Sequence, residues 1–422
     1  MKILHTSDWH LGKYLEKYSR LEEQALFIDE LVEICDEEKI DLIIIAGDIY
    51  DAVNPPIEAE KLFYNAMKRL SLNGERPIVI IAGNHDSPDR LFSPTPIMDE
   101  FGVFIKTDLK SITPIGEYKC CKVTRSGEAF IELEINNERA VIVTIPYITE
   151  KLLNSTISES LEEATQQKDF SNKVKILLDQ LAENFLDDTI NILMMHLYAL
   201  KGLETDSERK IQSIGGTYAV DPNIFPEKAQ YVALGHLHKQ QKVSSNNNCM
   251  AYYSGSPIAY SKSEVYTKNN NKINNDKGII VLDIKANEVI KEDINIKKIN
   301  LKDYKPMYSI SGDSASDVIK QIKDLDKNSG DGYIYIEINS KGGITSSELR
   351  EIRESTKKNI VNIVNNTDVV EEDREDVNYR TIEEKSIVEH FMDFYKIKEG
   401  KEVTEELIKM LEEVLNDEAD KP

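Results

Sequence analysis

Five short apolar runs occur between residues 1 and 238 of this chain, and each ends in side chains that commonly bind metal ions. Each run is rich in β-branched residues and too short for a helix, which predicts a buried strand. Strands that are apolar on both faces lie inside a covered sheet, and in layered α/β proteins binding groups gather where such strands end. The runs are KILHTSDWH, DLIIIAGDIYD, PIVIIAGNHD, NILMMH and YVALGHLH. The sequence therefore predicts five strand ends that converge on one rim.

The polar residues at these strand ends are carboxylates, an amide and histidines. Such groups are typical ligands of manganese, iron or zinc, and the lack of cysteine among them argues against a structural zinc site. Five of the seven histidines of the chain lie here. The motifs are, in order, Asp8-x-His10, Gly47-Asp48-x-x-Asp51, Gly83-Asn84-His85-Asp86, His196 and Gly235-His236-x-His238. One such motif alone is more often a turn, but five together predict two metal ions that act on a phosphate ester.

The residues of this set have different expected roles. Two ions roughly 3.5 to 4 Å apart usually share a carboxylate, and Asp48 is our candidate for that bridge. His85 follows a candidate ligand, Asn84, and adjacent side chains rarely bind the same ion. We therefore interpret His85 as a general acid or transition-state donor that a neighbouring carboxylate such as Asp86 positions. The alternative is that His85 only donates a hydrogen bond behind the ligands.

Four other residues of metal-binding type are left out of the ligand set. Asp51 and Asp86 could bind an ion, but aspartates that follow a strand often bond to their own backbone. His5 lies inside the first run, where a core histidine is expected, and His390 lies in a helical pattern near the C-terminus. We expect both of these histidines to be structural.

The order of the five motifs resembles that of the calcineurin-like metallophosphoesterase superfamily. The flanking segments are similar to a narrower family within it, the SbcD nuclease subunits of bacterial SbcCD complexes. These segments are HTSDWHLGK, GLETDSERKIQSIGG, YVALGHLHKQQ and YYSGSPIAYSKSE, so the resemblance covers roughly residues 1 to 265. It implies an α/β fold in which a two-sheet sandwich is flanked by helices.

The resemblance also implies an activity and a residue assignment. The implied enzyme is an ATP-regulated, manganese-dependent double-strand exonuclease and single-strand endonuclease acting on DNA ends and hairpins, with magnesium or iron as alternative ions. His85 would be catalytic. One ion would be held by Asp8, His10, Asp48 and His238, and the other by Asp48, Asn84, His196 and His236. A small-molecule phosphodiesterase or phosphomonoesterase with the same ions is the alternative, whereas a non-catalytic scaffold would not need every ligand type.

Composition bears on the expected partner and location. The net charge of −23 opposes simple DNA binding, since proteins that hold DNA usually display a basic face. Two divalent ions would add positive charge at the site, and the rest of the DNA affinity is expected from a partner subunit. No run approaches the roughly 20 apolar residues of a membrane span, so we expect a cytoplasmic protein. The four cysteines lack disulfide spacing and are expected to be free thiols.

The chain is predicted to contain several parts. We expect a nuclease domain at 1–265, an α+β capping domain at 276–365, an acidic linker at 366–380 and C-terminal helices at 381–416. Those helices carry apolar stripes, and by resemblance they dock an SbcC-type ATPase. Helices are also expected at 20–38, 58–72, 88–100 and 157–186. Those near 58–72 and 88–100 are, by resemblance, candidate surfaces of a homodimer within a heterotetramer.

Overall fold

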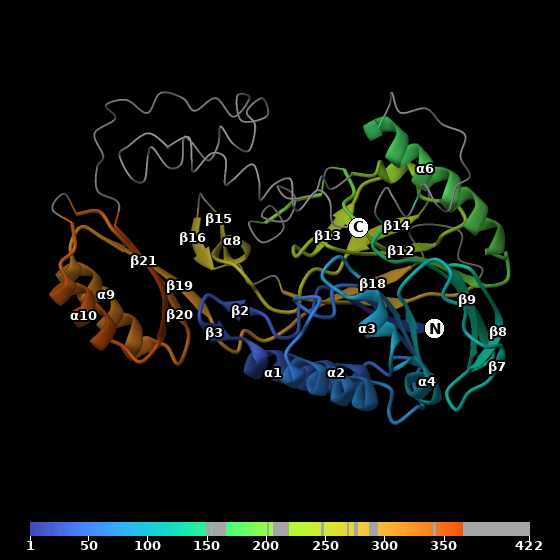
Figure 1. Cartoon of the computed structure of the whole chain (residues 1–422), viewed down its shortest axis with the longest axis horizontal. Coiled ribbons are helices and arrows are strands. Elements are labelled where there is room, and N and C mark those ends of the chain that lie inside the picture. Colours follow the sequence, from blue (N-terminus) through green and yellow to red (C-terminus); the bar gives the residue numbers. More distant parts are fainter. Residues whose placement is uncertain are drawn as a thin grey trace, which may run out of the picture. The chain divides into compact units, whose positions relative to one another are not determined.

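The computed structural model of the chain describes residues 1–148, 153, 166–200, 202–205, 219–245, 249–267, 270–273, 277–286, 294–340 and 343–365 (Figure 1). Almost all of these residues belong to one compact unit, Met1–Ile338 with Ile344–Val364. The other unit, Asn339–Gly343 with Asn365–Pro422, lies mostly outside the described residues. The linker expected at 366–380 and the helices expected at 381–416 also lie outside them. Among the described helices, none has the length and apolar character needed to cross a membrane.

Four neighbouring parallel strands make up one side of the first sheet, with β6 (Val103–Lys106) at its edge. β1 (Lys2–Thr6) pairs with β4 (Leu42–Ala46), β4 with β5 (Ile78–Ile81), and β5 with β6. All residues of β4 and β5 are buried, as expected for strands that are covered on both faces. The parallel pairing directs the carboxyl ends of β1, β4 and β5 to one edge, where three of the five motifs begin.

Helices connect these parallel strands and cover the outer face of the sheet. In α1, Phe27, Leu31 and Ile34 recur at helical spacing and pack on the same apolar core as β4, together with residues of α2. Figure 1 shows α1 and α2 side by side along one side of the strands. The expected helices at 20–38 and 58–72 are therefore confirmed, and the one at 88–100 is three short pieces. The bounds are α1 Leu21–Glu37, α2 Ile57–Leu70, α3 Pro88–Phe92, α4 Thr95–Met98 and η1 Asp99–Phe101.

Two strands within the range expected for the second domain belong to this first sheet. β17 (Gly278–Asp283) pairs antiparallel with β1, and β18 (Asn295–Asn300) pairs antiparallel with β17. The sheet order is β18-β17-β1-β4-β5-β6. The expected start of a separate domain at residue 276 is therefore wrong, because the chain returns to the first sheet after an asparagine-rich stretch, residues 261–277, and leaves this sheet only after Asn300.

The second sheet has eight strands, with β10, β11, β12 and β14 parallel to one another and the others antiparallel to their neighbours. The order of the eight strands is β13 (Gln241–Val243), β14 (Met250–Tyr253), β12 (Tyr231–Gly235), β11 (Ile190–His196), β10 (Glu138–Ile145), β9 (Phe130–Ile135), β8 (Lys122–Gly127) and β7 (Gly116–Glu117). Three of these strands, β8, β9 and β10, are consecutive in the chain and pair antiparallel as a meander.

The two sheets face each other across a shared core. One apolar cluster combines Ile44 and Val79 of the first sheet with Ile142, Ile192 and Tyr231 of the second. Helix α6 (Gln166–Leu181) covers the outer face of the second sheet and is the described part of the helix expected at 157–186. The expected α/β two-sheet sandwich with flanking helices is thus confirmed. Smaller elements are β2 Tyr14–Leu15, β3 Tyr18–Ser19, η3 Ala182–Asn184, η4 Pro222–Ile224, α8 Lys262–Val265, β15 Tyr266–Thr267 and β16 Asn270–Ile273.

A small α+β part follows the first sheet. Its strands, in the order β19-β20-β21, carry two helices, and a capping box of Thr345 and Glu348 begins α10. Tyr333 anchors this part to the rest of the unit by packing with Leu15 and donating a hydrogen bond of 2.6 Å to Glu23. The elements are β19 Met307–Gly312, α9 Ala315–Asn328, β20 Tyr333–Ile338, α10 Ser346–Glu354 and β21 Asn359–Asn365.

Candidate metal centre

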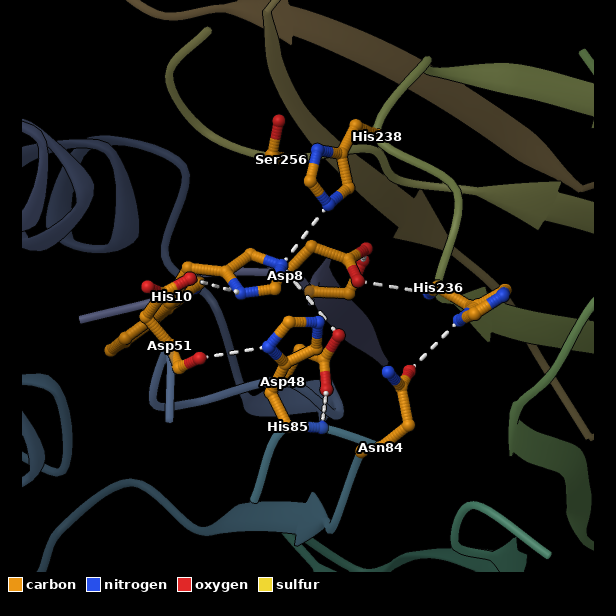
Figure 2. A network of polar contacts seen from close by, with 12 residues as sticks. Asp8, His10, Asp48, Asp51, Asn84, His85, His236, His238 and Ser256 are labelled. Carbon is orange, nitrogen blue, oxygen red and sulfur yellow. Dashed lines mark hydrogen bonds and ion pairs between the residues drawn. The ribbon is translucent and has the colours of Figure 1, made fainter. Parts of the chain in front are cut away.

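All eight predicted site residues meet at one edge of the sandwich (Figure 2, in which His196 is not labelled). Six of them are almost fully buried, and Asn84 and His85 are partly exposed. The first sheet supplies its residues directly after β1, β4 and β5, and the second sheet supplies the last residue of β11 and the turn after β12. The set comprises Asp8, His10, Asp48, Asn84, His85, His196, His236 and His238.

One group of side chains gathers around Asp8. Ligand atoms of Asp8, His10 and His238 all lie within 4.8 Å of one another. The Nε2 atoms of His10 and His238 are 3.0 Å apart. At this separation one of the two nitrogens can donate a hydrogen bond to the other, and with that proton removed both could bind the same ion.

A second group gathers around Asn84. Its Oδ1 atom lies 3.0 Å from Nε2 of His196 and 2.9 Å from Nδ1 of His236. Figure 2 shows the Asn84 amide directed toward His236, with Asp48 on its other side. This group contains oxygen and nitrogen donors and no thiolate, which is the donor set that manganese, iron and zinc accept.

Asp48 lies between the two groups. Its Oδ2 atom is 3.6 Å from Nε2 of His10 and 3.4 Å from Nε2 of His196. Its Oδ1 atom accepts the backbone N–H of His85 at 2.9 Å. One carboxylate oxygen that faces a histidine of each group has the position that a bridging ligand needs.

The outward nitrogens of three histidines each face a carbonyl or carboxylate oxygen. Nδ1 of His196 donates to the Ala46 carbonyl at 2.8 Å, and Nδ1 of His238 lies 3.3 Å from Glu264. Nδ1 of His10 lies 3.4 Å from Asp51. Metal-binding histidines usually direct their other nitrogen to a carbonyl or carboxylate in this way, so that the inner nitrogen faces the ion and can bind it once that nitrogen carries no proton. The residues present therefore fit two divalent ions.

Glu264 and its partner Lys277 were missed by the sequence analysis. Glu264 lies in the short helix α8, and the hydroxyl of Ser261, the residue before this helix, donates to the Glu264 carboxylate at 3.2 Å. The Ser261-x-x-Glu264 spacing is typical of a helix start, which is the one signal that could have drawn attention to it. Nothing in the sequence indicates that its carboxylate faces His238.

His85 has a different partner from the one expected. Its Nδ1 donates to the main-chain carbonyl of Asp51 at 2.8 Å, and its ring stands edge-on to His10. The expected positioning role of Asp86 is wrong, because its carboxylate instead accepts the backbone N–H groups of Ile49, Tyr50 and Gly83 at 3.1, 2.9 and 2.8 Å. Asp86 thus ties together the two loops that carry Asp48 and His85.

The two remaining histidines, His5 and His390, are not part of the site residues described above. His5 is buried inside β1, and its Nδ1 lies 2.9 Å from the hydroxyl of Tyr231. The expectation that His5 is a core histidine is confirmed. His390 lies outside the described residues.

The electrostatics of the site depend on its burial. Burial lowers the pKa of His10 and His236 to about 3, and burial raises the pKa of Asp8. Burial alone would also lower the pKa of His196, but the adjacent Asp48 carboxylate raises it to about 9. Without metal, therefore, a proton on His196 balances Asp48, and a divalent ion would have to replace that proton.

The backbone at the site is held in unusual conformations. Four site residues have positive φ angles, a backbone conformation that residues other than glycine rarely adopt. They are Asp8 (55°), His10 (45°), Asp48 (51°) and His236 (100°). Such strain persists where the surrounding structure enforces it, and it is concentrated at functional sites. The motif glycine Gly235 lies so close to β4 that a Cβ atom there would be 1.8 Å from the Ala46 carbonyl oxygen.

Comparison with known proteins gives a family and two relatives. Residues 1–240 match the sequence profile of calcineurin-like phosphoesterases. The chain is 34% identical over 417 residues to a protein from Bacillus subtilis strain 168 that is named as the SbcD subunit of the nuclease SbcCD, covering 98% of this chain and 97% of that protein. It is 31% identical over 350 residues to the protein of the same name from Staphylococcus epidermidis, covering 83% and 82%.

Solved structures give a much weaker likeness. A dimetal phosphatase from Danio rerio overlaps with a TM-score of 0.39 at 12% identity, covering 71% of this chain and 95% of that one. The protein TT1561 from Thermus thermophilus overlaps with a TM-score of 0.34 at 11% identity, covering 70% and 98%.

Proposed function

This chain belongs to the calcineurin-like phosphoesterase family and, within it, to the SbcD nuclease subunits, and on that basis we propose that it cuts DNA ends and hairpins with two divalent ions. It is a metal-dependent phosphodiesterase of the nuclease type. The observation that carries the proposal is the position of Asp48, whose Oδ2 faces His10 on one side and His196 on the other.

The proposed ligand sets follow the two groups of side chains. Manganese is the proposed ion, because the donors combine carboxylates, an amide oxygen and imidazoles, which suits a hard to borderline metal. When bound, two such ions polarise the phosphoryl oxygens and activate a water molecule. One ion is assigned to Asp8, His10, Asp48 and His238, and the other to Asp48, Asn84, His196 and His236.

The protein supplies a residue, His85, that could donate a proton to the substrate. The Asp51 carbonyl accepts the Nδ1 proton of His85, so the ring is fixed and its Nε2 remains available to substrate. His85 is partly exposed, and a phosphodiester at the site could reach it. We propose that the imidazolium form of His85 gives its Nε2 proton to the leaving oxygen, or donates it as a hydrogen bond in the transition state.

A comparison of two substrates tests the proposed substrate class. We expect the protein with Mn²⁺ to digest a linear DNA duplex and a hairpin, and to act poorly on para-nitrophenyl phosphate. The similarity to nuclease subunits over almost the whole chain supports this expectation over a small-molecule phosphatase. Efficient turnover of para-nitrophenyl phosphate with intact DNA would contradict it, and omission of Mn²⁺ is the control.

We further propose that the chain acts in the cytoplasm as a homodimer together with an SbcC-type ATPase. The relatives are named as subunits of a complex, which supports a partner. Exposed apolar side chains on and near the helices expected to form the dimer surface support self-association: Val53, Ile57, Phe92 and Ile97. The net charge of −23 also favours a partner that contributes positive charge toward DNA.

Truncation tests the proposed ATPase contact. A chain that ends after residue 375 lacks the stretch 381–416, and we expect it to keep basal Mn²⁺-dependent cleavage but to stop co-purifying with an SbcC-type ATPase. Purification of both subunits from one cell, with the full chain as the control, measures this. Co-purification of the truncated chain would place the contact elsewhere.

A further inference from the structure

A buried ion pair lies behind His238, on the side that faces away from the metal site. Glu264 and Lys277 form it, and their side chains are only 1% and 7% exposed. Glu264 belongs to α8, whereas Lys277 immediately precedes β17. The pair therefore joins the two ends of the asparagine-rich stretch directly behind a proposed ligand.

The pair contacts both the ring and the backbone of His238. Oε1 of Glu264 lies 3.3 Å from Nδ1 of His238, and the hydroxyl of Ser261 donates to the same oxygen at 3.2 Å. Oε2 of Glu264 accepts from Nζ of Lys277. That Nζ also donates to the His238 carbonyl at 2.8 Å and to Oγ of Ser256 at 2.7 Å.

We infer that Glu264 and Lys277 are positioning residues that fix the tautomer and the orientation of His238 for one of the two ions. A carboxylate accepts the Nδ1 proton, so the lone pair must lie on Nε2, which faces Nε2 of His10 at 3.0 Å. Lys277 balances the buried charge of Glu264, which would otherwise be costly to keep ionised. The inference rests on the proposed role of His238 as a ligand.

Glu264 and Lys277 should influence the binding of only one of the two ions. His10, in the same proposed ligand set, has a similar but more open arrangement of Asp51 and Lys13, which are 28% and 20% exposed. His196, in the other set, directs its outward nitrogen to a neutral carbonyl of Ala46. Within the described part of the chain, the buried acid and base therefore support the ion assigned to Asp8, His10, Asp48 and His238.

Glu264→Gln tests this inference with almost no change of shape. The glutamine amide could donate to Nδ1 of His238 and so favour a proton on Nε2, which blocks the lone pair. We expect Mn²⁺ titration of the metal-free variant, followed by the electron paramagnetic resonance signal of free Mn²⁺, to show one ion bound as in the wild type. The other should bind about 10- to 100-fold more weakly. Duplex cleavage should recover at higher Mn²⁺.

Two controls separate this effect from a general loss of stability. Glu132→Gln removes an equally buried carboxylate, paired with Arg125 and Arg139 at 3.1 Å on the second sheet, and should leave Mn²⁺ affinity unchanged. Lys277→Arg keeps the positive charge and should weaken the same ion less than Glu264→Gln. Wild-type Mn²⁺ affinity for both ions in Glu264→Gln overturns the inference.

A second measurement does not depend on any variant that could fail to fold. Nitrogen chemical shifts of ¹⁵N-histidine in the metal-free wild-type protein should report His238 as the Nδ1–H tautomer, and an Nε2–H tautomer overturns the inference. His238→Ala separates the inference from its premise. If that variant still binds two ions tightly, the ligand assignment fails; if it loses one ion while Glu264→Gln loses none, only the positioning role fails.

Discussion

Asp48→Asn is expected to remove both metal ions and reduce DNA cleavage below detection. Asp48 is the one proposed ligand shared by both ions, and its Oδ2 lies 3.6 Å from His10 and 3.4 Å from His196. Asparagine keeps the size of the side chain and an oxygen that can accept the His85 N–H. The loss should therefore reflect the missing charge and bridge, not a collapsed loop.

Metal content after dialysis against dilute Mn²⁺, measured by mass spectrometry, should fall from two ions per chain toward none, and a duplex digestion should show the loss of cleavage. Asp283→Asn is a matched control, because Asp283 is an exposed carboxylate on the same sheet and should leave both measurements unchanged. Two ions retained by Asp48→Asn would refute the proposed bridge.

His85→Ala is expected to reduce cleavage of a DNA duplex by about 10²- to 10⁴-fold while two Mn²⁺ ions remain bound. The His85 ring donates to the Asp51 carbonyl and stands edge-on to His10, and its Nε2 belongs to neither proposed ligand set. Its removal should therefore affect proton donation and leave the ion positions intact. Single-turnover digestion and Mn²⁺ stoichiometry measure the two quantities.

The identity of the leaving group separates the two roles proposed for His85. A para-nitrophenyl phosphodiester has a leaving oxygen that needs no proton, so a general acid would matter much less for it. We expect the loss in His85→Ala to be far smaller on this ester than on DNA. An equal loss on both substrates would instead favour hydrogen bonding to the transition state, and wild-type cleavage of DNA would exclude both roles.

The predictable part of the site depends on local sequence. Apolar runs followed by Asp, Asn or His identify strand ends, and parallel strands bring such ends together. For this reason all eight predicted residues, from Asp8 to His238, lie at one edge of the sandwich. The conformations of the turns, such as the φ of 100° at His236, were not visible in that pattern.

The sequence-based predictions were wrong or incomplete where a strand or side chain interacts with a residue far away in the sequence, or with backbone N–H groups. The segment GIIVLDI, which contains β17, is apolar whichever sheet it joins. Its place beside β1 follows only from the pairing of strands in the folded protein. Asp86 looks like a neighbour of His85, yet its carboxylate is used by three backbone N–H groups. Glu264 lies 26 positions from His238, and no periodicity connects them. Side-chain partners of this kind follow from the fold and not from composition.

The origin of the proposed ligands in two different sheets has a consequence for the life of the protein in the cell. Asp8, Asp48 and Asn84 extend from the first sheet, and His196, His236 and His238 from the second. Ions bound between these residues would link the two sheets to each other. A ligand at 100 times its dissociation constant stabilises a fold by about 2.7 kcal/mol. A shortage of the metal in the cell would then lower both the cleavage activity and the free energy of unfolding. A protein without its ions would be degraded more readily, so its amount and its activity would decline together.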